Sequence, residues 1–271
     1  MKPEEISKVV NEVVERVVRR LDDTSHGDLP TPADDRMFAE RRSRLDQAIA
    51  AGACRLSPQT LTVDQCSDLA SMIEQTLLRP DAREPEVRDL CREAIERGLA
   101  AVCLWLDWAE IAASALEGSQ VRLSVPVAFP SGGLSTEAKA AEVRRAVALG
   151  ADELDVVMNT ARLRAADYPA VVEDLQAARR AAQGRTIKVV IEAADLTREQ
   201  TATAAVLAKS AGAQFVKSST GFGPDAVTVG DVALIRSVLT GETLLGETAR
   251  PELAARVGAV VSIGGSPAHR P

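Results

Sequence analysis

The sequence predicts an α/β fold in which helices alternate with the strands of a parallel sheet. One unit recurs after residue 70: a helical stretch ends at a glycine, and a short β-rich run follows. A glycine just past the end of a helix, followed by a buried strand, is typical of the joint between helix and strand in a parallel sheet. The four copies of this joint begin at Gly98, Gly150, Gly212 and Gly258.

The number of β-rich runs narrows the fold class. Eight runs follow one another over about 200 residues, with helical stretches such as 135–149 and 168–183 between them. The runs that do not follow one of the four glycines lie at 72–78, 122–130, 186–193 and, more weakly, near 243–247. This count predicts a TIM (β/α)8 barrel. An open doubly wound sheet is the main alternative, although no GxGxxG motif follows the first strand.

The first 36 residues differ from the rest. Residues 1–21 predict an amphipathic helix, because Ile6, six valines and Leu21 recur at steps of three and four residues. Residues 22–36 hold five aspartates, two prolines and a glycine, which indicates a flexible linker. We therefore expect a tethered helix, a linker, and a globular domain over residues 37–271 that opens with a helical stretch at 37–53.

Composition excludes several classes of function. The chain has 271 residues, of which 46% are hydrophobic, so it can bury a sizeable core. A net charge of −7 and an aromatic content of 3% argue against a nucleic-acid binder. No apolar run approaches the ~20 residues of a membrane span, and we expect no secretory signal. Four cysteines without a CxxC pair, and two histidines, lead us to expect reduced thiols and no metal site.

Two lysines stand out as candidates for chemistry. The chain has six lysines, and only Lys188 and Lys217 lie within predicted strands. A lysine on a buried strand costs free energy unless it is paired or neutral, and a neutral amine is a nucleophile toward carbonyl groups. Lys217 is therefore either a Schiff-base lysine, held uncharged by burial, or half of a buried ion pair.

Other polar residues also lie in the predicted strands. Asp155 is either a proton-transfer group or a counter-ion for a lysine. Lys188 and Glu192 share one face of their strand, so a pair between them would explain both. Cys103 reads as a small core residue.

Five segments together resemble the deoxyribose-phosphate aldolases. They are Glu74-Gln-Thr-Leu-Leu-Arg-Pro-Asp-Ala, the stretch from Phe129-Pro-Ser-Gly-Gly to Glu142, Gly150-Ala-Asp-Glu-Leu-Asp-Val-Val, Lys188-Val-Val-Ile-Glu and Phe215-Val-Lys-Ser-Ser-Thr-Gly-Phe. The resemblance covers about 70–265 of the chain. It implies a class I aldolase on a TIM barrel, without metal or organic cofactor. Such an enzyme cleaves 2-deoxy-D-ribose 5-phosphate to glyceraldehyde 3-phosphate and acetaldehyde.

The resemblance also implies roles for individual residues. Lys217 would be the Schiff-base nucleophile, Asp155 its acid/base partner acting through water, and Lys188 a residue of the pocket. The positions that match the pocket wall or a backbone phosphate contact are Thr76, Cys103 and Gly221. Beyond the resemblance, the loop after the last strand offers backbone N–H groups of Gly264, Gly265 and Ser266 to a phosphate, or is a glycine-rich turn without a ligand.

The sequence departs from the family in three places. Family members carry a second lysine on strand seven, whereas no lysine follows Lys217 here and the region 243–250 reads as shortened. Glu74 stands where the family has an aspartate, and the chain stops soon after Ile263. We hypothesise that Lys188 partly replaces the missing charge. The alternatives are a catalytically impaired barrel acting as a binding or assembly module, and an imine aldolase with a different acceptor.

Residues 3–21 with the linker resemble the encapsulation peptides of bacterial microcompartment cargo enzymes. This implies a shell protein or a fellow cargo protein as partner, and a cytoplasmic location inside a microcompartment. The helix could instead fold back on the barrel, self-associate or lie on a membrane. The absence of Trp and Phe from its apolar face weighs against a membrane. We also expect a homo-oligomer, and no nucleic-acid partner.

Overall fold

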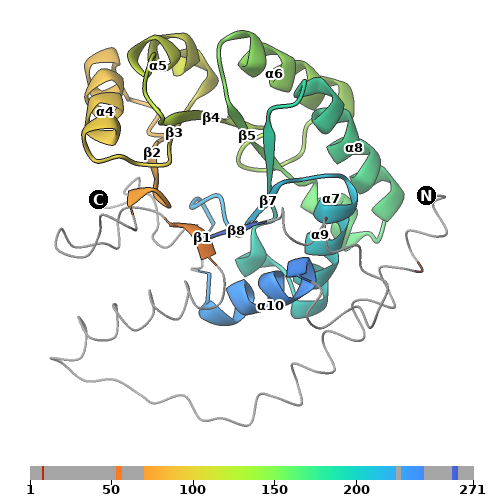
Figure 1. Cartoon of the computed structure of the whole chain (residues 1–271). Coiled ribbons are helices and arrows are strands. Elements are labelled where there is room, and N and C mark those ends of the chain that lie inside the picture. Colours follow the sequence, from red (N-terminus) through yellow and green to blue (C-terminus); the bar gives the residue numbers. More distant parts are fainter. Residues whose placement is uncertain (1–7, 9–52, 57–69, 224–226, 241–257, 262–271) are drawn as a thin grey trace, which may run out of the picture.

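A computed structural model describes residues 8, 53–56, 70–223, 227–240 and 258–261 (Figure 1). The strands in this part of the chain are β1 (Ala53–Leu56), β2 (Glu74–Leu77), β3 (Ala101–Leu104), β4 (Arg122–Val127), β5 (Glu153–Val157), β6 (Thr186–Val190), β7 (Phe215–Lys217) and β8 (Gly258–Val261). The helices are α4 (Glu84–Glu96), α5 (Ala109–Ala115), α6 (Thr136–Ala148), α7 (Thr160–Arg164), α8 (Tyr168–Ala181), α9 (Arg198–Ser210) and α10 (Val229–Thr240). Two short 3-10 helices are η3 (Leu106–Trp108) and η4 (Ala193–Asp195).

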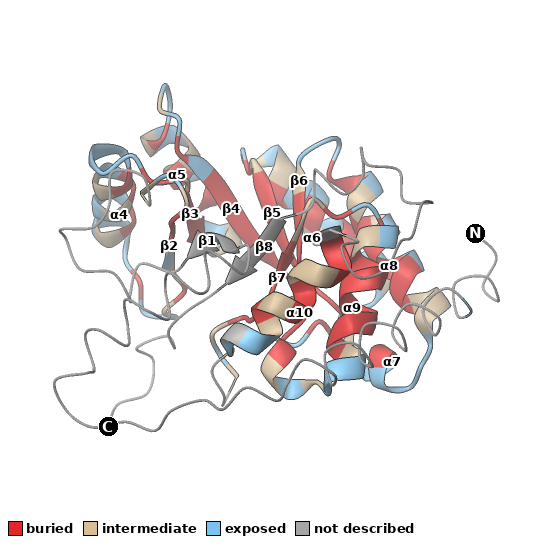
Figure 2. Ribbon diagram, turned by 60° about the horizontal axis from the view of Figure 1, so that its bottom comes forward, coloured by how far each residue is buried: buried red, intermediate tan, exposed pale blue. Residues whose placement is uncertain are grey.

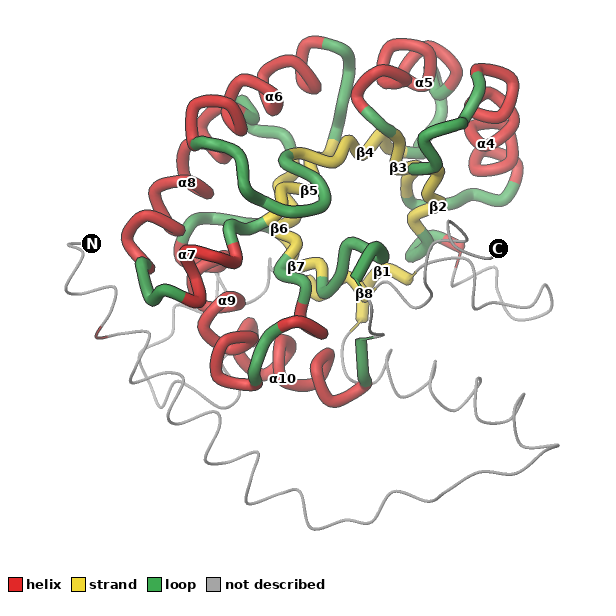
Figure 3. Tube along the Cα trace, turned by 180° about the vertical axis from the view of Figure 1, so that it is seen from behind, coloured by secondary structure: helices red, strands yellow, loops and turns green. Residues whose placement is uncertain are grey.

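All eight strands belong to one parallel sheet in the order β1-β8-β7-β6-β5-β4-β3-β2. Figure 3 shows the strands as a curved inner wall with the helices outside it. A doubly wound sheet would carry helices on both faces, so this alternative does not describe the molecule. The fold is α/β and TIM-barrel-like. Within the described residues, β1 and β2 are the end strands of the sheet.

The core lies in two places, inside the curved sheet and between the sheet and its helices. Every residue of β3 and of β5 is buried, which is expected when a parallel strand is covered on both faces. Figure 2 shows the same burial along the sides of α8 and α9 that face the strands. Alanines dominate the buried side of α9, so this helix can lie close to the sheet.

The predicted glycine joints are confirmed where the structure describes them. Gly98, Gly150 and Gly212 follow α4, α6 and α9 with φ of 63°, 97° and 89°. Such positive φ values are disfavoured for residues with a Cβ atom. At Gly150 a Cβ would also lie 2.8 Å from the Cβ of Ala113, so this turn packs against α5.

The predicted elements need one correction, and two predictions lie outside the described residues. The helix predicted over 37–53 is wrong at Ala53, which begins β1. Four residues are too few to show a period of two, and β1 is defined by its pairing with the distant β8. The weak run near 243–247 lies outside the described residues, as does the predicted N-terminal helix except for Lys8, which is helical. No helix in the described ranges is long and apolar enough to cross a membrane.

Candidate active site

The two lysines in the strands meet inside the curved sheet. Lys217, the last residue of β7, donates from Nζ to Asp155 Oδ2 on β5 at 2.6 Å and to Glu74 Oε1 on β2 at 2.8 Å. Strands β2 and β7 are not neighbours, so the bond to Glu74 crosses the interior of the sheet. The Lys217 side chain is 10% exposed, and both carboxylates are buried.

Lys188 lies beside this pair and is fully buried. Its Nζ is 2.8 Å from Asp155 Oδ1 and 3.0 Å from Glu153 Oε2, and it also donates to the second oxygen of Glu74. The two lysines therefore share the carboxylates of Glu74 and Asp155. In each carboxylate, one oxygen contacts Lys188 and the other contacts Lys217. The predicted pair between Lys188 and Glu192 is wrong, because the Lys188 side chain points into the sheet interior.

Burial and charge act in opposite directions on the pKa of Lys217. Burial alone lowers it, but the negative charges of Asp155 and Glu74 outweigh burial and raise the pKa well above its usual value. The pKa of Lys188 is raised for the same reason by Asp155, Glu74 and Glu153. The geometry matches the buried ion pair, one of the two readings that the sequence left open for Lys217. The raised pKa values favour the ammonium form of both amines in this arrangement.

Two neutral side chains complete the surroundings of Asp155. Ser124 on β4 donates to Asp155 Oδ1 at 2.9 Å, and Cys103 Sγ on β3 lies 3.9 Å from Asp155 Oδ2. Burial and the nearby carboxylate raise the pKa of the Cys103 thiol, so it stays protonated. Thr76 on β2 pairs in register with Cys103 but is exposed. These positions place Cys103 at the charge cluster and Thr76 at its edge.

Glu74, Cys103 and Asp155 also bring three ligand atoms within 4.8 Å of one another. Two carboxylates and a thiol form a donor set that can bind a cation. In this site, however, both carboxylates already accept hydrogen bonds from ammonium groups. The chain itself supplies the positive charges between them.

The loop after β7 is organised by Glu192. Its carboxylate accepts from Ser219 Oγ at 2.7 Å, from the Thr220 backbone N–H at 3.0 Å and from the Thr220 hydroxyl. The backbone N–H of Gly221 in turn donates to Ser219 Oγ at 2.9 Å. The N–H proposed to meet a phosphate is thus engaged within its own loop. Gly264, Gly265 and Ser266 lie outside the described residues.

Three aromatic rings from three loops stand at the ends of the strands that carry the site. Phe129 contacts Trp105 and Phe222 edge to face, with ring centroids 5.6 and 5.3 Å apart. Trp105 donates its indole N–H to the Leu78 carbonyl at 2.9 Å, and Phe222 is 41% exposed. The rings tie together the segments that follow β3, β4 and β7.

Sequence reasoning missed several charged residues of the interior. Glu74 was noted only as a departure from the family, and Glu153 was not singled out. The signal was present, because Glu153 and Asp155 alternate along one strand and therefore share a face. Lys139, which the sequence analysis did not single out, lies on α6, where it is fully buried and bonds to Asp174 and to the Val157 carbonyl.

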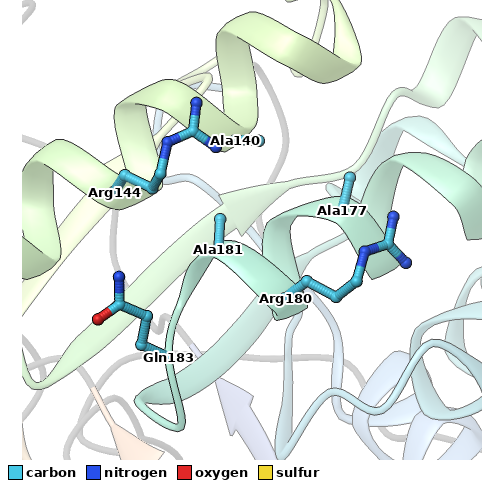
Figure 4. A pocket seen from close by; sticks show the side chains of 6 residues that line it. All are labelled: Ala140, Arg144, Ala177, Arg180, Ala181 and Gln183. Atoms are coloured by element: carbon cyan, nitrogen blue, oxygen red, sulfur yellow. The ribbon is translucent and has the colours of Figure 1, made fainter.

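A groove on the outside of the molecule is separate from these residues. Figure 4 shows this cavity of about 360 Å³ between α6 and α8. It is lined by Ala140, Arg144, Ala177, Arg180, Ala181 and Gln183. None of the predicted site residues lies in it.

Comparison with known proteins agrees with the geometry. A family model described as DeoC/LacD family aldolase matches residues 63–266. The chain belongs to this family. A deoxyribose-phosphate aldolase of Clostridium perfringens (strain SM101 / Type A) is 42% identical over 172 residues, which cover 63% of this chain and 77% of the relative. One of Deinococcus radiodurans is 43% identical over 173 residues, covering 64% and 79%.

Solved structures of the family have the same fold. A Coccidioides immitis protein assigned as a deoxyribose-phosphate aldolase superposes with a TM-score of 0.66 at 30% identity, covering 85% of this chain and 94% of that one. The deoxyribose phosphate aldolase of Aeropyrum pernix, described as a tetramer, has a TM-score of 0.58 at 25% identity, covering 88% and 95%. These two structures thus share the overall fold of this chain.

The Lys139–Asp174 pair is expected to be a strong structural contact. The change Lys139→Met leaves the Asp174 carboxylate buried without its cation, at a cost of about 3–5 kcal/mol in the free energy of unfolding. The double variant Lys139→Met/Asp174→Leu is expected to recover most of the loss, since no buried charge remains. Urea denaturation measures both. Equal losses in the single and double variants would contradict this assignment.

Proposed function

We propose that this protein is a deoxyribose-phosphate aldolase of class I, in which Lys217 forms a Schiff base with the substrate. The observation that carries the proposal is the placement of Lys217 at the end of a parallel strand, buried and 2.6 Å from Asp155. Active sites of TIM-barrel enzymes lie at this end of the strands. The curved sheet fits a closed barrel of that kind. The names of the Clostridium and Deinococcus relatives support the substrate, 2-deoxy-D-ribose 5-phosphate.

The reaction begins with a proton transfer. Lys217 is an ammonium in the resting site and must lose a proton before it can react. Asp155 Oδ2 is the nearest acceptor that the structure places on Nζ. The neutral amine then attacks the aldehyde carbon C1 of the open-chain sugar. Asp155 returns its proton to the resulting C1 hydroxyl, which leaves as water, so that a protonated imine and an ionised Asp155 remain.

The protonated imine acts as an electron sink for the cleavage step. Asp155, directly or through water, removes the proton of the C3 hydroxyl. The C2–C3 bond breaks, its electron pair moves toward the imine to form an enamine, and glyceraldehyde 3-phosphate departs. Protonation of the enamine at C2 and addition of water then release acetaldehyde and restore the Lys217 amine.

Lys188 acts as the second cation of the site in this proposal. It shares Glu74 and Asp155 with Lys217, so the charge of one ammonium disfavours the charge of the other. This is the role that the family gives to the lysine missing after Lys217. Thr76 and Cys103 would form the pocket wall, and Gly221, Gly264, Gly265 and Ser266 would approach the phosphate.

Residues 3–21 are proposed to bind a microcompartment shell protein or a fellow cargo protein. The valine stripe and the acidic linker support this proposal, and with it the proposal of a location inside a microcompartment of the cytoplasm. A homo-oligomer is also proposed, supported by the tetrameric relative from Aeropyrum pernix.

Borohydride trapping tests the Schiff base directly. Reduction in the presence of acetaldehyde is expected to add one ethyl group to Lys217, because the imine forms there and becomes a stable amine. Mass spectrometry of the peptides locates the group. Lys217→Met should abolish the labelling, and Lys209→Met, which removes a half-buried lysine on α9, should leave it intact. Absence of an adduct in the unmodified protein would favour a non-catalytic binding module.

Loss of Lys188 is expected to shift the pH dependence of activity. Without this cation, Glu74 and Asp155 act on Lys217 alone and raise its pKa further, so less neutral amine is present at a given pH. Lys188→Met should lower kcat/KM at neutral pH at least about tenfold and move the acid limb of the pH profile to higher pH by about one unit. An unchanged profile would remove Lys188 from the mechanism.

Recruitment of a fusion tests the targeting proposal. Residues 1–36 joined to a fluorescent protein are expected to form foci when co-expressed with shell proteins, since docking buries the valine stripe. Replacing Val10 and Val14 by Glu should disperse the foci. Diffuse fluorescence of the original fusion would count against encapsulation.

A further inference from the structure

Charged residues connect the candidate active site to the opposite end of the strands. Arg122, Glu153 and Thr186 are the first residues of β4, β5 and β6, whereas Lys217 is the last residue of β7. Arg122 Nη1 lies 3.0 Å from Glu153 Oε1. The Arg122 side chain is 54% exposed, and Glu153 is fully buried. A solvent-accessible cation thus pairs with a buried carboxylate at the far end of the sheet.

The contacts continue inward with alternating sign. Glu153 Oε2 is 3.0 Å from Lys188 Nζ, and Lys188 bonds to Asp155 and Glu74, which both bond to Lys217. Each oxygen of Glu153 therefore meets a different cation, one at the surface and one in the interior. Buried charges are weakly screened by solvent. Removing a charge at Arg122 or Glu153 therefore alters the electrostatic potential at Lys217.

We propose that Arg122 and Glu153 are positioning residues that set, through Lys188, the charge balance around Lys217 from the end of the barrel remote from the substrate. This rests on the proposed function, in which the neutral amine of Lys217 is the reactive form. Neither residue touches the reacting atoms. Arg122 determines how much of the Glu153 charge remains to be neutralised by Lys188.

The direction of each effect follows from the groups that face the two lysines. Among the described residues, these groups are Glu74 on β2, Cys103 on β3, Ser124 on β4, and Glu153 and Asp155 on β5. Lys188 on β6 and Lys217 on β7 also face each other. Removing Arg122 leaves the interior more negative and favours both ammonium groups. Removing the Glu153 charge makes the interior more positive and favours the neutral amine of Lys217.

A matched control lies beside Arg122. Arg122 and Arg185 both line a second surface groove, at this end of the strands. The Arg185 side chain is 46% exposed and pairs with Asp152 at 3.3 Å. Asp152 is itself 42% exposed, and its carboxylate accepts from Arg185 and from the Leu123 backbone N–H rather than from Lys188. Arg122→Gln and Arg185→Gln remove the same charge from the same groove, but only the first removes a partner of the buried Glu153.

The experiment measures reductive methylation of Lys217 by formaldehyde in the full chain, as a rate against pH. A borohydride reagent supplies the hydride that reduces the formaldehyde imine. Of the protein the reaction requires only the neutral amine, so it reports on Lys217 whether or not the protein cleaves a sugar phosphate. Peptide mass spectrometry follows Lys217, with Lys209 as an internal reference. The pH profile of kcat/KM for 2-deoxy-D-ribose 5-phosphate is measured on the same variants.

The variants are expected to shift the rate in opposite directions. At fixed alkaline pH, Arg122→Gln should slow methylation of Lys217 roughly threefold, a modest change because Arg122 is half exposed. Glu153→Gln should accelerate it about threefold to tenfold, and the double variant should return toward the original rate. Arg185→Gln should change it less than about 1.5-fold. The acid limb of kcat/KM should move to higher pH in Arg122→Gln and to lower pH in Glu153→Gln.

Two results would overturn the proposal. One is an Arg122→Gln profile that matches Arg185→Gln, and the other is a shift of the same sign in Arg122→Gln and Glu153→Gln. Arg122 is at the surface, so Arg122→Gln is expected to fold. If Glu153→Gln does not fold, the comparison of Arg122→Gln with Arg185→Gln still tests the proposal. If the two variants shift the methylation rate in opposite directions but the protein cleaves no sugar phosphate, the coupling of Arg122 and Glu153 to Lys217 is supported. The proposed function is then rejected.

Discussion

The sharing of Glu74 and Asp155 by Lys188 and Lys217 is the interaction on which the site depends. Burying an isolated charge costs many kcal/mol, so an interior with two lysines and three carboxylates requires nearly every charge to find a partner. The curved parallel sheet makes this feasible, since β2, β5, β6 and β7 direct their polar side chains to one point. Each carboxylate has two oxygens, and each oxygen of Glu74 and Asp155 serves a different amine.

In the proposed mechanism, the same pairing controls the chemistry of Lys217. An amine held as an ammonium by two carboxylates is stable but unreactive, and it becomes a nucleophile only when a proton moves. The proposed proton acceptor, Asp155, is one of the two carboxylates that stabilise the Lys217 ammonium. The resting and the reactive site therefore differ mainly in whether the proton lies on Lys217 or on Asp155. Glu74, whose side chain is longer by one methylene than the aspartate of the family, reaches from β2 to both lysines across the interior.

The sequence predicted the parallel α/β sheet and singled out two lysines that the structure brings together inside it. Glycines at helix ends and buried β-rich runs located seven of the eight strands, and lysines inside apolar strands pointed to Lys188 and Lys217. Asp155 was identified with both of its readings open, and the structure places it where it can serve as counter-ion and proton acceptor. The misses have physical causes. The short β1 is defined by pairing with a distant strand, and the charge state of Lys217 depends on Glu74, which is 143 positions away in the chain. A pattern within one strand cannot reveal that partner.

The loop after β7 has a consequence for substrate selection. The backbone N–H of Gly221 already donates to Ser219 Oγ, whose hydroxyl is held by Glu192. A phosphate that approached this N–H would exchange one hydrogen bond for another and would meet the charge of the Glu192 carboxylate behind it. The dianion would therefore gain little binding energy from the Gly221 N–H itself, so that affinity for the phosphoryl group would depend on donors outside this loop, such as those proposed at Gly264, Gly265 and Ser266.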